Sequence, residues 1–272
     1  MSIDILYKSM LGRSAVVMLQ KTGLFRLASL FLKTGLSRKM IPGYIKKHQI
    51  DMQDFQGQNY RSFAEFFSRK RDTVLNSRSP KVLMSPCDGL LSVYSITGDM
   101  HLDMKGSSYR LTDIIPDPVI AKHFLDGICL VFRLQASDYH HFCAFDGAML
   151  SKAHFIPGQL HSVQPIACEK VPVYRLNRRW WSLLDTDHFG MAVQVELGAM
   201  LVGGVHFAKE SGRLNRGDAM GNFELAGSTI LLLLSSEVRE RLTLYSRYQE
   251  TLMGSVEVPV RMGEEIGELT DG

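Results

Sequence analysis

The chain has 272 residues, of which 45% are hydrophobic and 22% are charged, and its formal net charge is +3. This composition is typical of a folded protein with a large core and argues against a disordered chain. So small a net charge does not indicate a nucleic-acid-binding protein, and four cysteines without C-x-x-C spacing predict free thiols in a reducing compartment.

The N-terminal region carries charge of one sign. Between Asp4 and Asp51 there is no acidic residue, whereas nine lysines and arginines are interleaved with apolar runs at 15–19 and 24–32. A basic amphipathic helix with leucine and phenylalanine opposite its charges suits an anionic bilayer surface. No 18-residue window of this region is free of charge, so we predict neither a membrane span nor a signal peptide. The alternative is a helical hairpin packed on its own domain, with a solvated basic face.

An aromatic segment follows at 60–70. Phe63, Phe66 and Phe67 are at helical spacing, which predicts a helix packed by its aromatic side chains. Pro80 and the polar run 76–79 then predict a loop. We therefore place a helical, membrane-associating region at 1–75 and a β-rich catalytic region at 76–272.

Short strands and turns fill the second region. Strand-like runs lie at 82–84, 90–95, 128–134, 155–163, 191–205 and 256–263. Turn residues such as Asp88-Gly89 separate them. The predicted fold is α+β, with an N-terminal helical module on a mainly antiparallel β core.

One peptide junction in this region can undergo a chemical rearrangement. Gly227-Ser228-Thr229 is followed by five branched aliphatic residues, the pattern of a strand buried on both faces. The Ser228 hydroxyl can attack the Gly227 carbonyl and turn the amide into an ester. Loss of the Ser228 Cα proton would then cut the chain and leave a dehydroalanine that hydrolyses to an N-terminal pyruvoyl group. The alternative is a tight turn into a strand, where Gly-Ser is common.

Two other groups of residues could carry chemistry. His140, His141 and Cys143 are metal-ligand types, but their spacing is too crowded for an ordinary zinc site, so we predict no metal. Asp88, a histidine and Ser228 could form the charge relay used in acyl transfer. No G-x-S-x-G elbow and no phosphate-binding glycine loop is present.

Read in order, several stretches resemble the phosphatidylserine decarboxylases, which are pyruvoyl-dependent membrane enzymes. The resemblance runs from about residue 40 to the C-terminus. Two positions depart from the family pattern: Cys143 stands where many members have a second histidine, and Ala226 stands where leucine or glycine is usual. The matching stretches are Phe63 to Arg69, Ser85-Pro86-Cys87-Asp88-Gly89, Asp138-Tyr139-His140, Ile156-Pro157-Gly158, Gly190 to Gly203, and Asn215-Arg216-Gly217 through Gly227-Ser228-Thr229.

The resemblance implies a self-processing proenzyme. Ser228 would be the cleavage serine and become the pyruvoyl group, with Asp88 and His140 completing the cleavage triad. Cleavage between Gly227 and Ser228 would give a β chain, 1–227, and an α chain, 228–272, which stay together. Whether His140 or His141 carries each proton transfer is open.

The implied activity is decarboxylation of phosphatidylserine to phosphatidylethanolamine and CO2 through a Schiff base on the pyruvoyl group. The implied partners are the phospholipid substrate, an anionic membrane surface and a second copy in a homodimer, with no nucleic acid. The enzyme would be peripheral on the cytoplasmic face of the cell membrane. The alternatives are a related serine-headed lipid as substrate, a non-catalytic membrane-binding protein with Gly227-Ser228 intact, and a metal-dependent hydrolase built on His140, His141 and Cys143.

Overall fold

The computed structural model describes residues 3–71, 79–200, 204–225, 227–252 and 256–271. The predicted boundary at residues 75 and 76 lies outside the described residues, as does Ala226. Helices dominate the part before residue 71, as predicted. They are α1 (Ile3–Lys8), α2 (Met10–Lys21), α3 (Leu24–Leu32), α4 (Ile41–His48) and α5 (Phe63–Phe67), with 3₁₀ turns at Gly35–Met40 and Gln53–Phe55.

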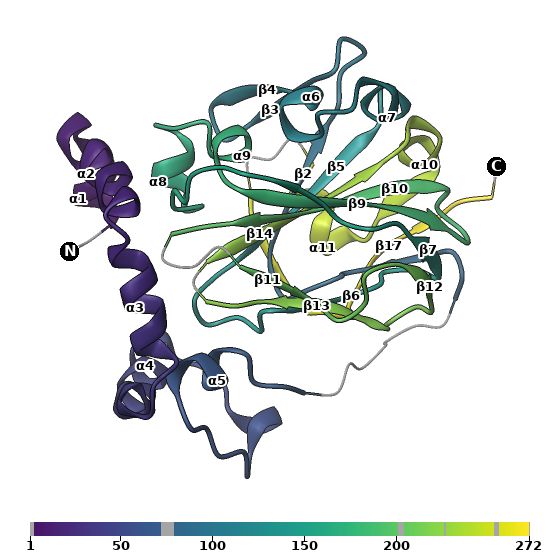
Figure 1. The fold of residues 1–272 in the computed structure, drawn as a ribbon. Coiled ribbons are helices and arrows are strands. Elements are labelled where there is room, and N and C mark those ends of the chain that lie inside the picture. The colour runs from purple at the N-terminus through teal and green to yellow at the C-terminus, as the bar shows by residue number, and fades with distance from the viewer. Residues whose placement is uncertain (1–2, 72–78, 201–203, 226, 253–255, 272) are drawn as a thin grey trace.

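The remainder is built on antiparallel sheets, which confirms the predicted β core (Figure 1). The largest has nine strands in the order β12-β7-β9-β10-β14-β5-β2-β16, with β8 also paired to β9. Every strand pair in it is antiparallel. Its strands are β2 (Gly89–Ser95), β5 (Ile128–Leu134), β7 (Ala148–Leu150), β8 (His154–Ile156), β9 (Arg179–Thr186), β10 (Met191–Gly198), β12 (Gly212–Leu214), β14 (Ser228–Leu234) and β16 (Val258–Val260).

Smaller sheets and short helices surround the large sheet. One sheet has the order β11-β13-β6, a second β1-β17-β15, and a third pairs β3 with β4. Their strands are β1 (Val82–Met84), β3 (His101–Met104), β4 (Ser107–Arg110), β6 (His141–Cys143), β11 (Val205–Phe207), β13 (Ala219–Phe223), β15 (Leu242–Leu244) and β17 (Glu265–Leu269). The helices are α6 (Leu111–Ile114), α7 (Pro118–His123), α8 (Pro165–Cys168), α9 (Val173–Leu176), α10 (Ser236–Arg241) and α11 (Ser246–Gln249).

Strand β14 lies inside the large sheet and is buried along its whole length. It pairs with β10 on one edge and with β5 on the other, so its backbone is bonded on both sides. Leu231 and Leu233 pack into one core, whereas Ile230 and Leu232 pack into the other. A strand buried on both faces is what the aliphatic run predicts.

Different elements cover the two faces of the sheet. The core on the Leu231 face includes residues of α1, α2, α6 and α8. The core on the Ile230 face includes Phe142 of β6 and Phe223 of β13, so the β11-β13-β6 sheet covers that side. Because side chains alternate along a strand, Ser228 shares the face of Ile230. The serine therefore points toward the β6–β13 sheet.

The aromatic helix is confirmed as α5, and its partners were not predicted. Phe63, Phe66 and Phe67 pack with Ile41 of α4 and with Leu225, three residues before Ser228. The strand predictions were less accurate at the ends. The run at 155–163 ends as a strand at Ile156, the run at 256–263 holds only β16, and the run at 191–205 divides into β10 and the start of β11. Residues 201–203 within that run are outside the described residues.

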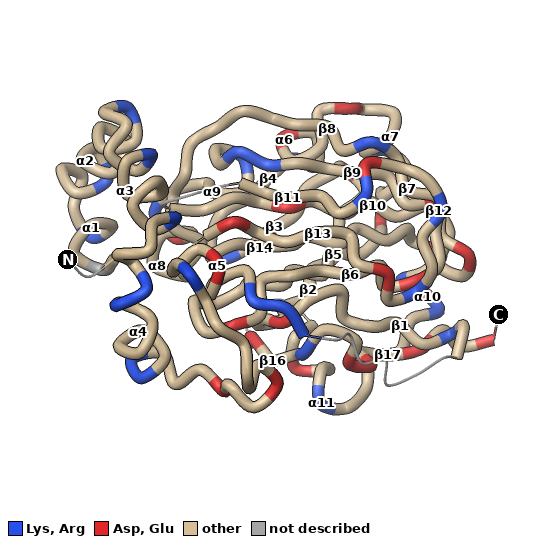
Figure 2. Tube along the Cα trace, turned by 60° about the horizontal axis from the view of Figure 1, so that its bottom comes forward, with Lys and Arg blue, Asp and Glu red and all other residues tan. Residues whose placement is uncertain are grey.

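Helix α3 has no buried residue. Leu24, Leu27, Leu30 and Phe31 are exposed on it, and Leu27 exposes 63% of its surface. Lysines and arginines are distributed along the N-terminal helices (Figure 2). Among the described residues no single helix has the length and apolar composition of a membrane span; α2 and α3 meet that criterion only as a pair, bent by 67°.

Candidate functional site

Ser228 and His140 meet in the interior. Ser228 is the first residue of β14, and His140 directly precedes β6, so each is fixed by a strand. The Nδ1 atom of His140 lies 3.3 Å from the Oγ atom of Ser228. Both residues are buried. The structure thus brings together two residues that are 88 positions apart in the chain.

The partner of the second ring nitrogen of His140 determines which of the two nitrogens carries the proton. Its Nε2 atom lies 2.9 Å from the backbone carbonyl oxygen of Gln135. A carbonyl oxygen only accepts, so Nε2 carries the hydrogen of the neutral ring. Burial lowers the pKa of His140 to about 3, which keeps the ring neutral near pH 7. The lone pair of Nδ1 therefore faces the Ser228 hydroxyl, as a general base requires.

Asp88 is held by other partners. Its Oδ1 atom accepts from Arg71 Nη2 at 2.5 Å and from the backbone N–H of Met262 at 2.8 Å. In the described part of the chain it makes no hydrogen bond to His140. The structure therefore assembles two members of the predicted triad and places the third in an ion pair with Arg71.

His141 is turned away from the serine. Its Nε2 atom donates to the backbone carbonyl of Ser68 at 3.2 Å, and its ring stacks on Tyr139 with centroids 4.5 Å apart. Of the two neighbouring histidines, His140 is thus the one in contact with Ser228.

Cys143 occupies the position where many members of the resembled family have histidine. It is buried, and burial raises the pKa of its thiol to about 12, with a smaller contribution from the Asp88 carboxylate. A neutral thiol does not supply the base that an imidazole would. Among the described residues no three histidine, cysteine, aspartate or glutamate side chains are grouped to hold a metal ion.

Gly227 has room around it. A Cβ atom built there would approach Val163 Cγ2 to 3.6 Å and the Leu134 carbonyl oxygen to 3.7 Å, which are ordinary contacts. Packing therefore does not require glycine before Ser228.

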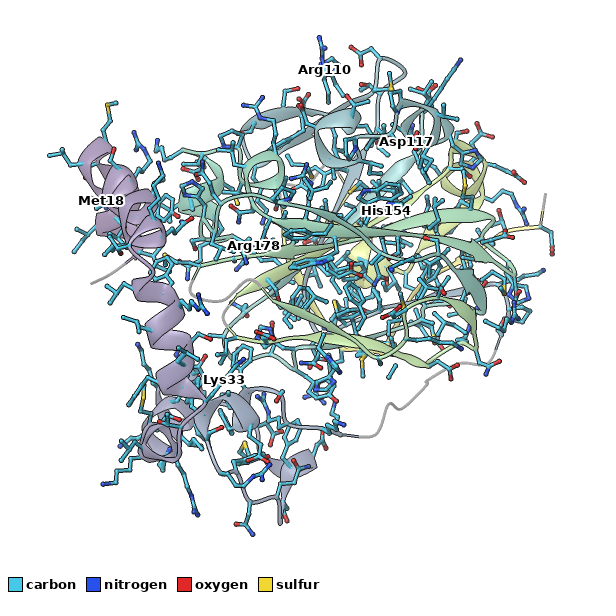
Figure 3. The ribbon with its side chains drawn as sticks, viewed as in Figure 1. Met18, Lys33, Arg110, Asp117, His154 and Arg178 are labelled. Carbon is cyan, nitrogen blue, oxygen red and sulfur yellow. The ribbon has the colours of Figure 1, made fainter. Side chains whose placement is uncertain are left out.

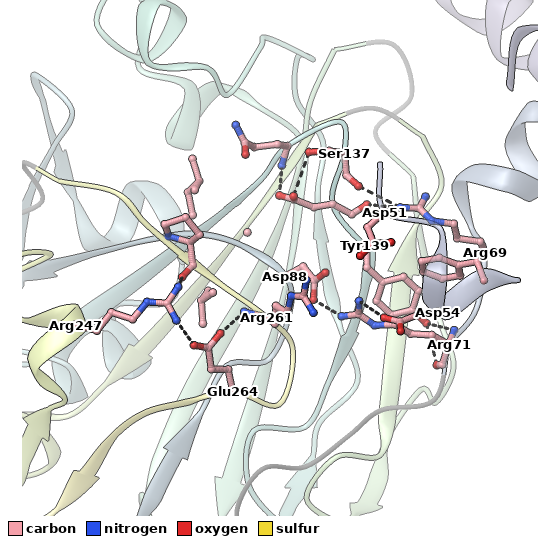
Figure 4. Close-up of a pocket in the computed structure, with 17 residues that line it drawn as sticks. Asp51, Asp54, Arg69, Arg71, Asp88, Ser137, Tyr139, Arg247, Arg261 and Glu264 are labelled. Carbon is pink, nitrogen blue, oxygen red and sulfur yellow. Dashed lines mark hydrogen bonds and ion pairs between the residues drawn. The ribbon is translucent and has the colours of Figure 1, made fainter. Parts of the chain in front are cut away.

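A polar cavity of about 520 Å³ lies beside the loop that precedes His140 (Figure 4). Part of its lining comes from this loop, through Gln135, Asp138 and Tyr139. Arg71 and Asp88, which form an ion pair, also line it. Neither Ser228 nor His140 lines the cavity. The loop thus separates a charged cavity from the buried histidine and serine.

Sequence reasoning did not single out Gln135, Arg69 or Arg71. Arg69 and Arg71 follow the aromatic helix in a short basic run, and Arg69 ends one of the matching stretches. The basic run was the available signal, but nothing in its spacing says that these side chains contact the loop before His140.

The chain is similar to known proteins over most of its length. The family model described as phosphatidylserine decarboxylase matches residues 61–268. The phosphatidylserine decarboxylase proenzyme 2 of Clostridium acetobutylicum is 35% identical over 280 residues, covering 99% of this chain and 92% of that protein. The phosphatidylserine decarboxylase proenzyme of Clostridium kluyveri is 35% identical over 96% of this chain and 90% of that protein. That of Ruminiclostridium cellulolyticum is 32% identical over 87% of this chain and 81% of that protein.

Proposed function

The chain belongs to the phosphatidylserine decarboxylase family, and we propose that it decarboxylates phosphatidylserine to phosphatidylethanolamine and CO2 with a pyruvoyl group made from its own Ser228. The observation that carries this proposal is the contact between the neutral His140 imidazole and the Ser228 hydroxyl. The relatives' description as proenzymes supports a maturation step.

Maturation begins with proton transfer from Ser228. The hydroxyl proton passes to Nδ1 of His140, and Oγ attacks the carbonyl carbon of Gly227. The bond from that carbon to the Ser228 nitrogen breaks, and the proton from His140 goes to the released amine. The product is an ester between the Gly227 carbonyl and the Ser228 side chain, and His140 is neutral again.

The ester is then eliminated. A base removes the Cα proton of residue 228, and the bond from Cβ to the ester oxygen breaks, leaving Gly227 with a carboxylate. The remaining enamine tautomerises to an imine, takes up water and releases ammonia, which gives a ketone at the new N-terminus. His140 is our candidate for the base because its ring already contacts the side chain of residue 228.

The two pieces are expected to remain one molecule. After cleavage the α chain, 228–272, still supplies β14 between β10 and β5. It also supplies β16, which pairs with β2, and β17, which pairs with β1. Met262 bonds to Asp88 across the same division. The position next to His140 is therefore retained by backbone pairing on several strands.

The pyruvoyl ketone supplies an electrophile that condenses with the serine amine of the lipid and accepts the electron pair released with CO2. The chain's own residues hold that position. Residue 228 stays at the head of a buried strand, next to Nδ1 of His140, and because that ring is neutral near pH 7 it can pass a proton there only after taking one up. A related serine-headed lipid would meet the same chemistry and is the alternative substrate.

The N-terminal helices are proposed to bring the enzyme to the cytoplasmic face of the cell membrane. Exposed apolar side chains on α2 and α3 support this, among them Leu27 of α3 and Met18 of α2. Figure 3 labels Met18. The nine basic residues before Asp51 add attraction to anionic lipid. On their other side, α1 and α2 are bonded to residues 160–162 through Tyr7 and Gln20. These two helices are therefore docked on the protein and still expose part of their surface to solvent.

Intact mass analysis tests the proposed function. We expect two chains that end and begin at the Gly227-Ser228 junction, with a ketone at residue 228, and CO2 released from phosphatidylserine vesicles. Ser228→Ala is expected to give one unbroken, inactive chain. An unbroken wild-type chain with an ordinary serine at 228 would overturn the proposal, and if it still bound vesicles it would support the non-catalytic alternative.

A further inference from the structure

The segment that begins with α5 runs beside the loop that carries His140. Phe67 packs against the imidazole of His140 in a tilted arrangement, with ring centroids 4.2 Å apart and an interplanar angle of 32°. Two residues further on, Arg69 Nη2 donates to the backbone carbonyls of Ser137 at 3.1 Å and Asp138 at 3.2 Å. The helical region therefore forms one wall around the catalytic histidine.

Arg69 is an unusual group to find at this place. It is only 3% exposed, and its guanidinium lies 4.8 Å from the ring centre of Phe55 and 5.1 Å from that of Phe66. Within the described residues it has no carboxylate partner, and its Nε and Nη1 atoms have no hydrogen-bond acceptor. Burying a charge in this way is costly, so the two loop carbonyls that it does bind call for an explanation.

Those carbonyls belong to a closed turn. The Gln135 N–H donates to Asp138 Oδ2 at 2.7 Å, and the Asp138 N–H donates to the Gln135 carbonyl at 3.1 Å. The same Gln135 carbonyl accepts from Nε2 of His140. Arg69 holds the far side of this turn, and the orientation of the turn decides where the Gln135 carbonyl points.

We propose that Arg69 is a positioning residue for His140: by fixing the 135–138 turn it keeps the Gln135 carbonyl against Nε2, and so keeps Nδ1 unprotonated toward Ser228. This inference rests on the proposed function, because it concerns the base of the self-cleavage step. It also makes the helical region part of the catalytic machinery, in addition to any contact with lipid.

A purely electrostatic role has a different signature. Burial is the main cause of the low pKa of His140, and the positive charge of Arg69 acts in the same direction. Removing that charge alone would raise the pKa of His140. It would not lower the cleavage rate on the plateau of the pH profile, where the ring is neutral. Loss of positioning lowers the plateau itself, because misplacing a reacting group by about 1 Å costs on the order of 100-fold in rate.

The experiment follows self-cleavage after pulse-labelled cell-free synthesis, on denaturing gels over a range of pH. We expect Arg69→Met to lower the plateau rate on the order of 100-fold. Arg69→Lys should restore much of that rate, since an ammonium group can donate to the same two carbonyls. Arg179→Met is the matched control, because Arg179 is similarly buried and donates to the carbonyls of Asp113, Ile114, Arg175 and Asn177, none of which belongs to the 135–138 turn. It should cleave at the wild-type rate.

A second measurement does not depend on cleavage. In the unbroken Ser228→Ala chain, the ¹⁵N resonances of His140 report which ring nitrogen carries the proton. Arg69→Met should shift them away from the Nε2–H form, and Asp138→Ala, which opens the turn from its other end, should do the same. Unchanged resonances, or cleavage of Arg69→Met at the wild-type rate, would overturn the role of Arg69. A wild-type chain that never cleaves would overturn the proposed function instead.

Discussion

The Nδ1 atom of His140 lies 3.3 Å from the Oγ atom of Ser228, while its Nε2 atom is bound by a backbone carbonyl. In a Ser-His-Asp triad a carboxylate takes that second position and stabilises the imidazolium. A neutral carbonyl fixes the same tautomer but stabilises the charged ring less. The resulting base is weak, which suits a step that each chain performs once.

Substitutions of His140 and of its neighbour His141 should have unequal effects on maturation. His140→Gln removes the acceptor beside Ser228, so we expect cleavage to fall by about 100-fold or more, the usual range for a general base. His141→Gln removes the stacking on Tyr139 and alters the contact with the Ser68 carbonyl, neither of which involves Ser228, and should cleave at close to the wild-type rate. Band intensities over time on a denaturing gel measure both. Equal loss in the two variants would show that His140 is not the specific base.

Self-cleavage should be nearly independent of pH from 5 to 8. Only neutral His140 can accept the serine proton, and burial lowers its pKa to about 3, so the ring is neutral over this whole range. A histidine with an ordinary pKa near 6.5 would lose about 30-fold in rate at pH 5. Pulse-labelled precursor, chased at each pH, gives the profile. A steep fall below pH 6.5 would mean that His140 is far better solvated than in this structure.

The sequence predicted features that depend on local pattern. The aliphatic run after Ser228 has one physical solution, a strand covered on both faces, and β14 is that strand. The spacing of Phe63, Phe66 and Phe67 likewise predicted a buried helix. The meeting of His140 with Ser228 followed from the family resemblance and not from any periodicity.

What the sequence did not predict depends on how distant segments dock. Arg69 contacts a loop 68 residues away, and neither the loop nor the basic run shows a pattern that pairs them. Asp88 was assigned to a triad from its motif, but the docking of Arg71 and Met262 against it decides its hydrogen bonds. Contacts of this kind come from tertiary packing, for which one sequence holds no local signal.

Asp88→Asn should slow maturation, and the structure indicates how. The carboxylate ties Arg71 to Met262 and so joins the segment after α5 to the α chain. An asparagine can still accept from Met262 but loses the ion pair. If Asp88 acts by joining these segments, Arg71→Met should slow cleavage to a similar extent. If Asp88→Asn is slow and Arg71→Met is not, Asp88 has a direct part in proton transfer; wild-type rates in both would remove it from the machinery.

Binding to anionic vesicles should depend on the apolar face of α3. Leu27 and Phe31 are exposed there, so we expect Leu27→Gln combined with Phe31→Gln to weaken binding by about 100-fold or more, given roughly 1.5 kcal/mol or more for each large apolar side chain buried in lipid. Val119→Gln is the matched control, because Val119 is 83% exposed on α7, outside the N-terminal helices.

The basic residues should act differently from the apolar ones. Arg38→Gln with Lys39→Gln should weaken binding mainly at low salt, since screening removes long-range attraction at higher ionic strength. Sedimentation with vesicles of phosphatidylglycerol and phosphatidylcholine measures both sets of variants. Binding that none of them changes would favour a packed hairpin with a solvated basic face.

Glu196→Gln should stabilise the fold, increasingly so as pH rises. Glu196 is fully buried on β10, its Oε1 accepts from Gln194 at 2.8 Å, and burial raises its pKa to about 8. A raised pKa means that the folded chain holds a proton that the unfolded chain has lost above about pH 4.5. Wild-type stability therefore falls as pH climbs from 4.5 toward 8, by about 3 kcal/mol at pH 7.

Urea unfolding of the unbroken Ser228→Ala chain, with and without Glu196→Gln, checks this dependence at pH 5 and pH 7.5. The amide keeps the bond from Gln194 and has no charge to desolvate, so the gain in unfolding free energy should be small at pH 5 and large at pH 7.5. Glu240→Gln, at an exposed position on α10, is the control and should show no such growth with pH. A gain that does not grow with pH would mean that Glu196 is ionised in the folded protein, with a partner or water that stabilises its charge.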